Sequence, residues 1–252
     1  MEGKENKKLF ALVGRNISYS FSKGYFTKKF EDLKLEKNEY VNFDIQTIKE
    51  LPQKIKENKN NLKGMNVTIP YKLEVFNYLD KIDKKALRVG AVNTIRISKK
   101  GKLKGFNTDV YGFKKSLKPL LAKHHKKALI LGTGGASKAV AYVLEELGIK
   151  YKFVSRSPEG KKEISYNELS KEIIEAYQVI VNCTPLGTYP NIDDCPNIPY
   201  DSITSKHLLY DLIYNPSETA FLKKGKEKGA IVKNGLEMLE QQAEKAWRIW
   251  NK

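Results

Sequence analysis

A glycine-rich turn between a strand-like and a helix-like segment carries the first sign of chemistry. The apolar run 128–131 leads directly into a turn that contains Gly132, Gly134, Gly135 and Ala136. Glycines allow a tight turn and a close backbone approach, and the start of the following helix directs N–H groups and a positive dipole at a pyrophosphate. Ser137 stands where a GxGxxG pattern has its third glycine. The order strand, glycine turn, helix nevertheless predicts a dinucleotide-binding site.

The end of the next strand-like segment, 151–154, indicates which dinucleotide binds. Ser155, Arg156 and Ser157 follow this segment. Folds that bind NAD usually place an acidic residue here for the ribose hydroxyls. Arg156 has the opposite charge and suits a 2′-phosphate, to which Ser157 can add a hydroxyl donor. We therefore expect NADP(H) as the cofactor.

Four polar clusters lie at predicted strand ends or turns elsewhere in the chain. They are residues 18–22, 66–72, 91–94 and 105–109. The strand ends of α/β sheets form the ligand crevice, so these clusters predict a second binding site. In the second cluster, Lys72 follows Pro70 at an expected helix start.

The elements that must position these residues indicate the α/β class. Short apolar runs alternate with helix-like segments, which favours βαβ units around a mostly parallel sheet. The expected strands are 9–13, 40–45, 64–69, 92–97, 128–131, 151–154, 179–182, 208–211 and 230–232. A C-terminal helix should bury Leu239, Ala243, Ala246 and Trp250, which recur at spacings of one helical turn.

The connections between these elements suggest two lobes. Residues 97–103 are expected to form a turn between two strands, after which Asp109 could cap a helix running from Val110 towards Leu121. We expect a lobe boundary near residues 106–112. The proline-rich segment 185–199 should be an exposed loop.

Composition excludes several classes of protein. The chain has 252 residues, 40% of them hydrophobic, and a mean hydropathy of -0.52, which predicts a folded, soluble protein. We find no apolar run that could span a bilayer and no signal peptide, so a cytoplasmic location is expected. Two cysteines, Cys183 and Cys195, lack metal-ligand spacing, so we expect neither a disulfide nor a metal site.

The net charge of +17 attracts anions of every kind without choosing among them. Most lysines alternate with glutamates, which is typical of solvated helix faces, so nucleic-acid binding is not the expected role. His124 and His125 lie in a lysine-rich segment that suggests a solvated helix end.

The polar clusters and the glycine turn resemble the motifs of the shikimate dehydrogenase family. Three further segments extend the resemblance over essentially the whole chain, in the family's order: Asn182–Gly187, Asp211–Pro216 and Asn234–Gln242. The resemblance implies reversible, NADPH-dependent reduction of 3-dehydroshikimate to shikimate, in chorismate and aromatic amino acid biosynthesis. It implies a small-molecule substrate, no nucleic-acid or membrane partner, and a monomer or homodimer.

The resemblance also implies a fold. It places an α/β substrate-binding lobe in residues 1–107, completed by a returning C-terminal helix in 235–252, and a Rossmann-like, doubly wound NADP-binding lobe in 108–234.

Carried over position by position, the resemblance makes Lys72 and Asp109 the catalytic pair. Hydride delivery to a ketone builds alkoxide charge, which an ammonium can stabilise and protonate, while a carboxylate orients the lysine and a substrate hydroxyl. The implied substrate-binding residues are Ser20 and Ser22 for the carboxylate, with Thr68, Asn93, Tyr214 and Gln242. The implied cofactor contacts are Gly132, Gly134, Gly135, Ala136, Ser155, Arg156, Ser157, Thr184 and Gly235.

Several neighbouring residues receive other roles. Asn66 and Asn107 are expected to satisfy backbone groups, and Cys183 to be a reduced packing residue. The chain departs from the family pattern at Tyr19, where a histidine is usual, and at Lys23, where a proline often follows the second serine. Both changes bear on the loop that should bind the carboxylate.

Two alternatives stay open on the sequence. One is the quinate/shikimate dehydrogenase branch, which uses NAD or NADP and tolerates an extra ring hydroxyl. The other is a non-catalytic, basic nucleotide-binding protein.

Overall fold

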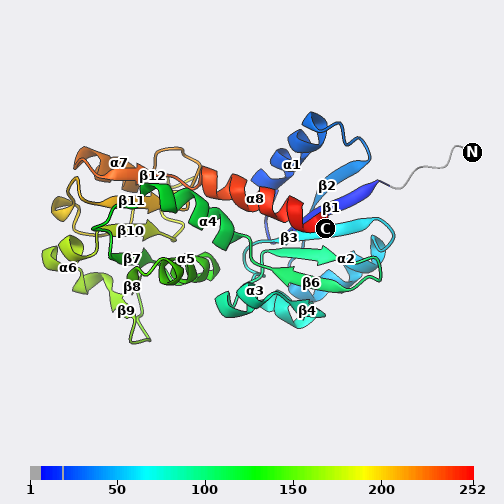
Figure 1. Ribbon diagram of the computed structural model, residues 1–252, viewed down its shortest axis with the longest axis horizontal. Helices are drawn as coiled ribbons and strands as arrows, with labels where there is room; N and C mark the ends of the chain where they lie inside the picture. The colour runs from blue at the N-terminus through cyan, green and yellow to red at the C-terminus, as the bar shows by residue number, and fades with distance from the viewer. Residues whose placement is uncertain (1–6, 19) are drawn as a thin grey trace, which may run out of the picture. The chain divides into compact units, whose positions relative to one another are not determined.

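Two compact units make up the protein. The computed structural model describes residues 7–18 and 20–252. The first unit contains the described residues up to Thr108 together with Ala243–Lys252, and the second is Asp109–Gln242. Each unit has its own six-stranded sheet (Figure 1), which confirms the α/β class.

The sheet of the first unit is mixed. Its strands are β1 (Lys8–Gly14), β2 (Asn38–Asp44), β3 (Leu62–Val67), β4 (Lys81–Ile82), β5 (Thr94–Ile97) and β6 (Leu103–Phe106), in the order β2-β1-β3-β5-β6-β4. Strand β1 is parallel to β2 and β3, whereas β5 is antiparallel to β3 and β6. The carboxyl ends of β1 and β3 therefore lie at one edge, where Val13 pairs with Val67.

Helices and apolar side chains complete this unit. The helices are α1 (Phe21–Asp32), α2 (Leu51–Glu57) and α3 (Lys84–Val89), with short 3-10 helices at Ile48–Glu50 and Glu74–Tyr78. Alternate residues of β1 enter two separate cores: Ala11 and Val13 join one, and Phe10 and Leu12 join the other. Strand residues alternate between the two faces of a sheet, so apolar groups bury both faces here.

The sheet of the second unit is parallel throughout. Its strands are β7 (Lys127–Leu131), β8 (Lys150–Ser155), β9 (Glu163–Ser165), β10 (Val179–Asn182), β11 (Leu208–Asp211) and β12 (Ile231–Lys233). Their order is β12-β11-β10-β7-β8-β9, which is the doubly wound Rossmann arrangement with its reversal between β7 and β10. Ligands bind at such a reversal in open α/β sheets.

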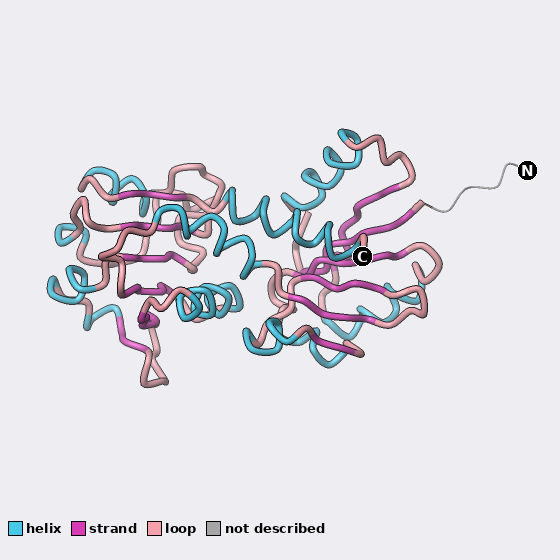
Figure 2. Tube along the Cα trace, in the orientation of Figure 1, coloured by secondary structure: helices cyan, strands magenta, loops and turns pink. Residues whose placement is uncertain are grey.

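The helices of the second unit connect these strands. They are α4 (Asp109–Leu117), α5 (Gly135–Glu146), α6 (Lys171–Ala176) and α7 (Ala220–Glu227), with 3-10 helices at Lys118–Leu120, Tyr166–Glu168 and Tyr200–Ser202. Figure 2 shows the alternation of strand and helix along this part of the chain.

The predicted C-terminal helix is present as α8 (Leu236–Trp250), and its predicted apolar face is the one that packs. Ala243, Ala246 and Trp250 are buried in the first unit, and Leu239 is half-buried. Gly64 on β3 leaves room for the Trp250 ring, whose Nε1 donates a 3.0 Å hydrogen bond to the carbonyl oxygen of Ile95.

Four local expectations need correction. Lys72 lies in a turn, and the following 3-10 helix begins only at Glu74. Helix α4 includes Asp109 and ends at Leu117, because Pro119 has no backbone N–H to continue it. The strand expected from residue 92 begins at 94.

The fourth correction concerns His125, which was expected at a solvated helix end. His125 is only 3% exposed, and its ring is held by backbone groups. The lysines that flank it gave no indication of this burial.

The 185–199 loop is mostly exposed, as expected, and contains no helix or strand, although Pro196 and Ile198 are buried within it.

Candidate active site

Backbone hydrogen bonds hold the turn that carries Lys72. The backbone N–H of Tyr71 donates to the carbonyl oxygen of Thr68 over 2.9 Å, and the buried Tyr71 hydroxyl donates to the carbonyl oxygen of Ile45 over 2.7 Å. The N–H of Val92 donates to the carbonyl oxygen of Lys72 itself over 2.8 Å. These hydrogen bonds fix the backbone at Lys72.

Ser20 and Ser22 stand at the start of α1. Ser20 is the N-cap, and its hydroxyl accepts a 3.1 Å hydrogen bond from the backbone N–H of Ser22. No acidic residue lies in the first turn, so the positive end of the helix dipole favours an anion here. Lys23 is exposed beside it, whereas Tyr19 lies outside the described residues.

The side-chain oxygen of Asn93 is fully engaged within the first unit. It accepts hydrogen bonds from the Thr108 backbone N–H over 2.7 Å and from the Thr108 and Thr94 hydroxyls over 3.1 Å each. Asn66 donates to the Asn93 carbonyl oxygen and Asn107 to that of Ala91, which confirms their predicted backbone roles. The amide of Asn93 thus has one fixed orientation.

The predicted site residues of the second unit include Asp109 and Gln242, both buried. Asp109 opens α4, and one turn later Gly112 allows close contact with α8. A Cβ at Gly112 would overlap the carbonyl oxygen of Met238 and lie 3.2 Å from the Cβ of Gln242. This close approach brings the helix of Asp109 against the helix of Gln242.

Tyr214 and Gly235 lie on adjoining loops of the second unit. Tyr214 is half-buried after β11, and burial raises the pKa of its phenol. The backbone N–H of Gly235 donates to the carbonyl oxygen of Ile213 over 3.0 Å, and a Cβ there would overlap the carbonyl of Leu212. Glycine is therefore required at 235 for packing.

The glycine turn has the form that a pyrophosphate requires. Gly132 has a φ of 97°, a left-handed conformation that side chains disfavour, and Gly134 is the N-cap of α5. Ser137 is fully buried, and its hydroxyl donates to the carbonyl oxygen of Gly134 over 2.7 Å. Ser137 therefore replaces the third glycine without disturbing the turn.

Thr184 lies against this turn from the other side of the sheet reversal. A Cβ at Gly132 would lie 3.1 Å from the Thr184 methyl group. The backbone N–H and hydroxyl of Thr184 donate to the side-chain oxygen of Asn182 over 3.0 and 2.7 Å. Asn182 in turn donates to Asp211, so two buried side chains position Thr184.

Arg156 is exposed after β8, beside Ser155 and Ser157. Ser155 and Ser157 form a local turn, with the N–H of Ser157 donating to the Ser155 hydroxyl over 3.2 Å. Burial raises the pKa of Tyr166, and the positive charge of Arg156 acts against this rise. The Arg156 guanidinium is therefore a solvent-accessible cation at the end of β8, close enough to Tyr166 to influence its pKa.

Comparisons with known proteins agree with this geometry. Residues 12–95 match the model of the shikimate dehydrogenase substrate-binding domain. A Clostridium beijerinckii protein named shikimate dehydrogenase (NADP(+)) is 42% identical over 250 residues, covering 96% of this chain and 91% of the relative. The chain belongs to the shikimate dehydrogenase family.

Solved structures of this family share the fold. Shikimate dehydrogenase from Aquifex aeolicus superposes with a TM-score of 0.87 at 36% identity, covering 98% of this chain and 93% of that one. Shikimate 5-dehydrogenase from Thermus thermophilus, solved in complex with NADP(H) and shikimate, has a TM-score of 0.84 at 32% identity, covering 96% and 93%.

Tyr40 contributes to the site but carries no sequence signal of function, because a tyrosine within an apolar strand is typical of packing. Asn182 and Asp211 belong to segments that resemble the family's motifs, but the sequence did not indicate that they position Thr184 through buried hydrogen bonds. Within the part of the chain that the structure describes, no group of three or more His, Cys, Asp or Glu residues could hold a metal ion. No described helix has the length and apolar character needed to cross a bilayer.

Proposed function

We propose that this chain is an NADP-dependent shikimate dehydrogenase, which reversibly reduces the 3-keto group of 3-dehydroshikimate to give shikimate. The observation that carries the proposal is the 42% identity, over 96% of the chain, to a relative with that name. The proposal places the reaction in chorismate and aromatic amino acid biosynthesis.

Lys72 and Asp109 are the proposed catalytic residues. NADPH, when bound, supplies the hydride. The Lys72 ammonium stabilises the negative charge that develops on the substrate oxygen and donates the proton. The Asp109 carboxylate accepts a hydrogen bond from a substrate hydroxyl, which fixes the ring relative to the lysine.

The substrate is recognised by hydroxyl and amide groups. Ser20 and Ser22 bind its carboxylate, supported by the N-terminus of α1. Thr68, Asn93 and Gln242 bind the ring hydroxyls and the carboxylate, and Tyr214 lies near the substrate. Because the Asn93 side-chain oxygen accepts three hydrogen bonds from the protein, its amide nitrogen is the group suited to a substrate hydroxyl.

The described residues fit the cofactor. Gly132, Gly134, Gly135 and Ala136 form a cradle that a Cβ at Gly132 would narrow, which suits a pyrophosphate. Arg156, with Ser155 and Ser157, provides the cation and hydroxyls for a 2′-phosphate. Thr184 and Gly235 complete the proposed contacts.

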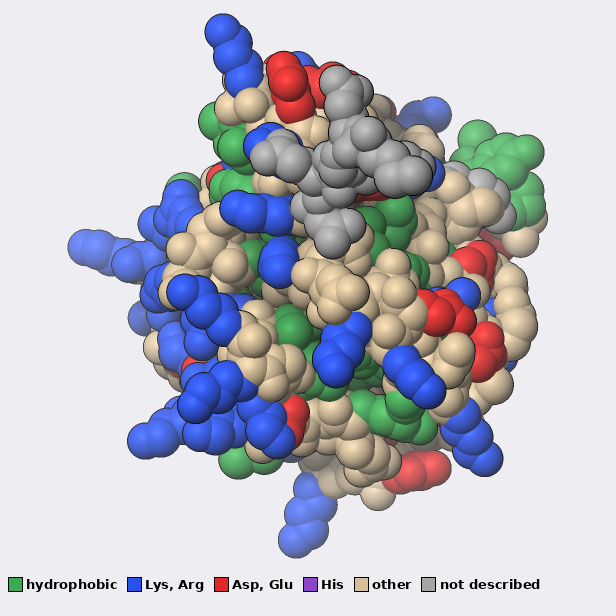
Figure 3. Space-filling model, turned by 90° about the vertical axis from the view of Figure 1, so that its right-hand side faces the viewer, with side chains coloured by type: hydrophobic (Ala, Val, Ile, Leu, Met, Phe, Trp, Pro, Cys, Tyr) green, Lys and Arg blue, Asp and Glu red, His purple; other side chains and the backbone are tan. Residues whose placement is uncertain are grey.

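The proposal assigns substrate binding to residues 1–107 with 235–252 and cofactor binding to 108–234. It includes a cytoplasmic location and a monomeric or homodimeric state. Lys and Arg side chains crowd along one side of the face in Figure 3. The net charge of +17 attracts anions in general, and a carboxylate substrate and a phosphorylated cofactor are both anions.

The test is reduction of the cofactor followed at about 340 nm, with shikimate and quinate offered separately, each with NADP+ and NAD+. Turnover confined to shikimate and NADP+ is the expected result. Comparable rates with quinate or NAD+ would assign the chain to the quinate branch. Absence of turnover with every pair would favour the non-catalytic binding protein.

A further inference from the structure

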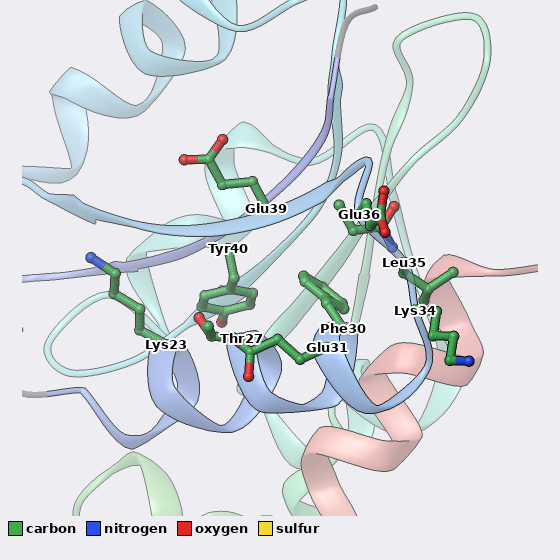
Figure 4. Close-up of a pocket in the computed structure, with 10 residues that line it drawn as sticks. Lys23, Thr27, Phe30, Glu31, Lys34, Leu35, Glu36, Glu39 and Tyr40 are labelled. Carbon is green, nitrogen blue, oxygen red and sulfur yellow. The ribbon is translucent and has the colours of Figure 1, made fainter.

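Tyr40 on β2 is a buried phenol that a path of hydrogen bonds connects to Asn93, a proposed substrate ligand. The residue is 3% exposed, and its ring stacks on Phe26 of α1 at a centroid distance of 4.7 Å and an angle of 11°. Figure 4 shows the ring reaching from β2 towards α1, with Phe30 beside it, under a surface groove of about 550 Å³. The ring packs against α1, and the hydroxyl makes a specific hydrogen bond.

The hydrogen bond of the Tyr40 hydroxyl leads towards Asn93. The Tyr40 hydroxyl and the Asn66 side-chain oxygen are 2.8 Å apart. Asn66 directs its side-chain nitrogen at the carbonyl oxygen of Asn93, which can only accept. The side-chain oxygen of Asn66 therefore faces Tyr40, and the phenol must be the donor.

Thr94 continues the chain of hydrogen bonds. Its hydroxyl accepts from the Asn66 side-chain nitrogen over 3.2 Å, so its own proton is available to the Asn93 side-chain oxygen, 3.1 Å away. Thr108 adds two further donors to that oxygen. The orientation of the Asn93 amide thus depends on a chain that begins at Tyr40.

We propose that Tyr40 is a positioning residue for substrate binding, whose hydroxyl acts through Asn66 and Thr94 on the side-chain amide of Asn93. This inference rests on the proposed function, which assigns Asn93 to the substrate. Every residue of the network belongs to the first unit.

The test is the Tyr40→Phe variant, which keeps the stacked ring and removes only the hydroxyl. The buried Asn66 oxygen loses its donor, so Asn66 and Thr94 are held less firmly, and the Asn93 side-chain oxygen keeps only its two hydrogen bonds from Thr108 as fixed contacts. We expect the KM for shikimate to rise about tenfold, while the KM for NADP+ stays within about twofold of the parent value. A rise of both constants together, or an unchanged KM for shikimate, would overturn the proposal.

Tyr25→Phe is the matched control. Tyr25 lies on α1, and its hydroxyl donates to Glu244 of α8 over 2.5 Å, away from the Asn66 chain. The control should leave both KM values unchanged even where it lowers the melting temperature. This comparison separates a specific effect of Tyr40 from a general loss of stability.

A double-mutant cycle with Asn93→Ala reports on coupling. Asn93→Ala should raise the KM for shikimate less in the Tyr40→Phe background than in the parent, and additive effects would contradict coupling. If Tyr40→Phe fails to fold, Thr94→Val breaks the same chain with little change of shape and should show the same KM split. Parental turnover is measured first: its absence refutes the proposed function, whereas normal turnover with an unaltered Tyr40→Phe variant refutes only the role of Tyr40.

Discussion

Asn182 and Asp211 are joined by a 3.0 Å hydrogen bond from the Asn182 side-chain amide to the Asp211 carboxylate, and both side chains are fully buried. The carboxylate also accepts from the Ile213 backbone N–H over 3.0 Å and from the Thr219 hydroxyl over 2.6 Å. One buried charge therefore fixes the loops that follow both β10 and β11. Thr184 and Tyr214, two proposed ligand-binding residues, lie on these loops.

Burial of this charge has a measurable cost. Desolvation raises the pKa of Asp211 from 3.8 to about 6, although three hydrogen bonds act in the other direction. The folded state therefore binds this proton more tightly than the unfolded state. The protonated Asp211 side chain contributes about 3 kcal/mol to the free energy of unfolding. This contribution is fully present below about pH 4 and is lost as the pH rises through about 6.

Asp211→Asn should remove that dependence, because the amide is neutral. Its oxygen can accept from Asn182 and from the Ile213 N–H, and its NH2 group can donate to the Thr219 hydroxyl. We expect the variant to gain about 1–3 kcal/mol over the parent in the free energy of unfolding at pH 7.5, and much less at pH 4.5. Urea denaturation at both pH values measures this. Asp201→Asn, at an exposed aspartate paired with Lys228, is the control. An equal gain at both pH values would contradict the assignment.

The contribution of His125 to stability should change with pH in the opposite direction. Its Nδ1 accepts from the backbone N–H of Ala122 over 3.0 Å, so Nε2 carries the proton donated to the carbonyl oxygen of Lys206. Burial is the main cause that lowers the pKa of His125. The unfolded state binds the additional proton more readily, so stability is retained above about pH 6.5 and lost below it.

The His125→Gln variant should lose stability at pH 7.5 and show a weaker decline between pH 7 and 5 than the parent. Thermal unfolding across this range measures both effects. His124→Gln, at the exposed neighbouring histidine, should retain the parental slope. A parental slope in His125→Gln would show that other groups cause the acid destabilisation.

Two helical glycines should respond to alanine with opposite signs. A Cβ at Gly112 of α4 would overlap the backbone of Met238, whereas a Cβ at Gly24 of α1 meets no atom within 4 Å. We expect Gly112→Ala to lower the free energy of unfolding by about 1–3 kcal/mol through overpacking. Gly24→Ala should raise it by up to about 1 kcal/mol, because alanine favours helix. Chemical denaturation of the two variants measures both changes in the free energy of unfolding. Equal changes in the two variants would contradict the packing argument.

The sequence predicted best the strands that are buried on both faces. Strands β10 and β11 begin and end where their apolar runs do, because a parallel sheet covered on both faces requires continuous apolar residues. The two- and three-residue strands β4 and β9 were not predicted. Such short elements exist through tertiary pairing and leave no periodic pattern.

The hydrogen-bond networks leave a weaker signal in the sequence than the glycine turn does. The glycine turn is a local feature, so its form follows from Gly132 and its neighbours. Tyr40 and Asp211 act through partners that are 26 and 29 residues away in the chain. Only the folded structure brings such partners together, and a tyrosine within an apolar strand is otherwise typical of packing.

Arg156 should determine the preference for the phosphorylated cofactor. Arg156→Ala removes the accessible cation, and we expect the KM for NADPH to rise at least about tenfold with little change in the KM for NADH. Steady-state kinetics with both cofactors measures the split. Arg248→Ala, at an exposed arginine of α8, should change neither constant. Equal effects on the two cofactors would mean that other residues bind the 2′-phosphate.

Lys72 provides the most direct test of the proposed chemistry. Its turn is held by the buried Tyr71 and by Val92, so truncating the side chain should leave the backbone in place. If the ammonium donates the proton, Lys72→Ala should lower kcat by about two to four orders of magnitude, with a smaller effect on NADPH affinity. Lys49→Ala, at an exposed lysine of the same unit, should keep the parental kcat. Near-normal turnover by Lys72→Ala would assign the proton to another donor, and a matching loss in Lys49→Ala would point to the overall charge of the unit.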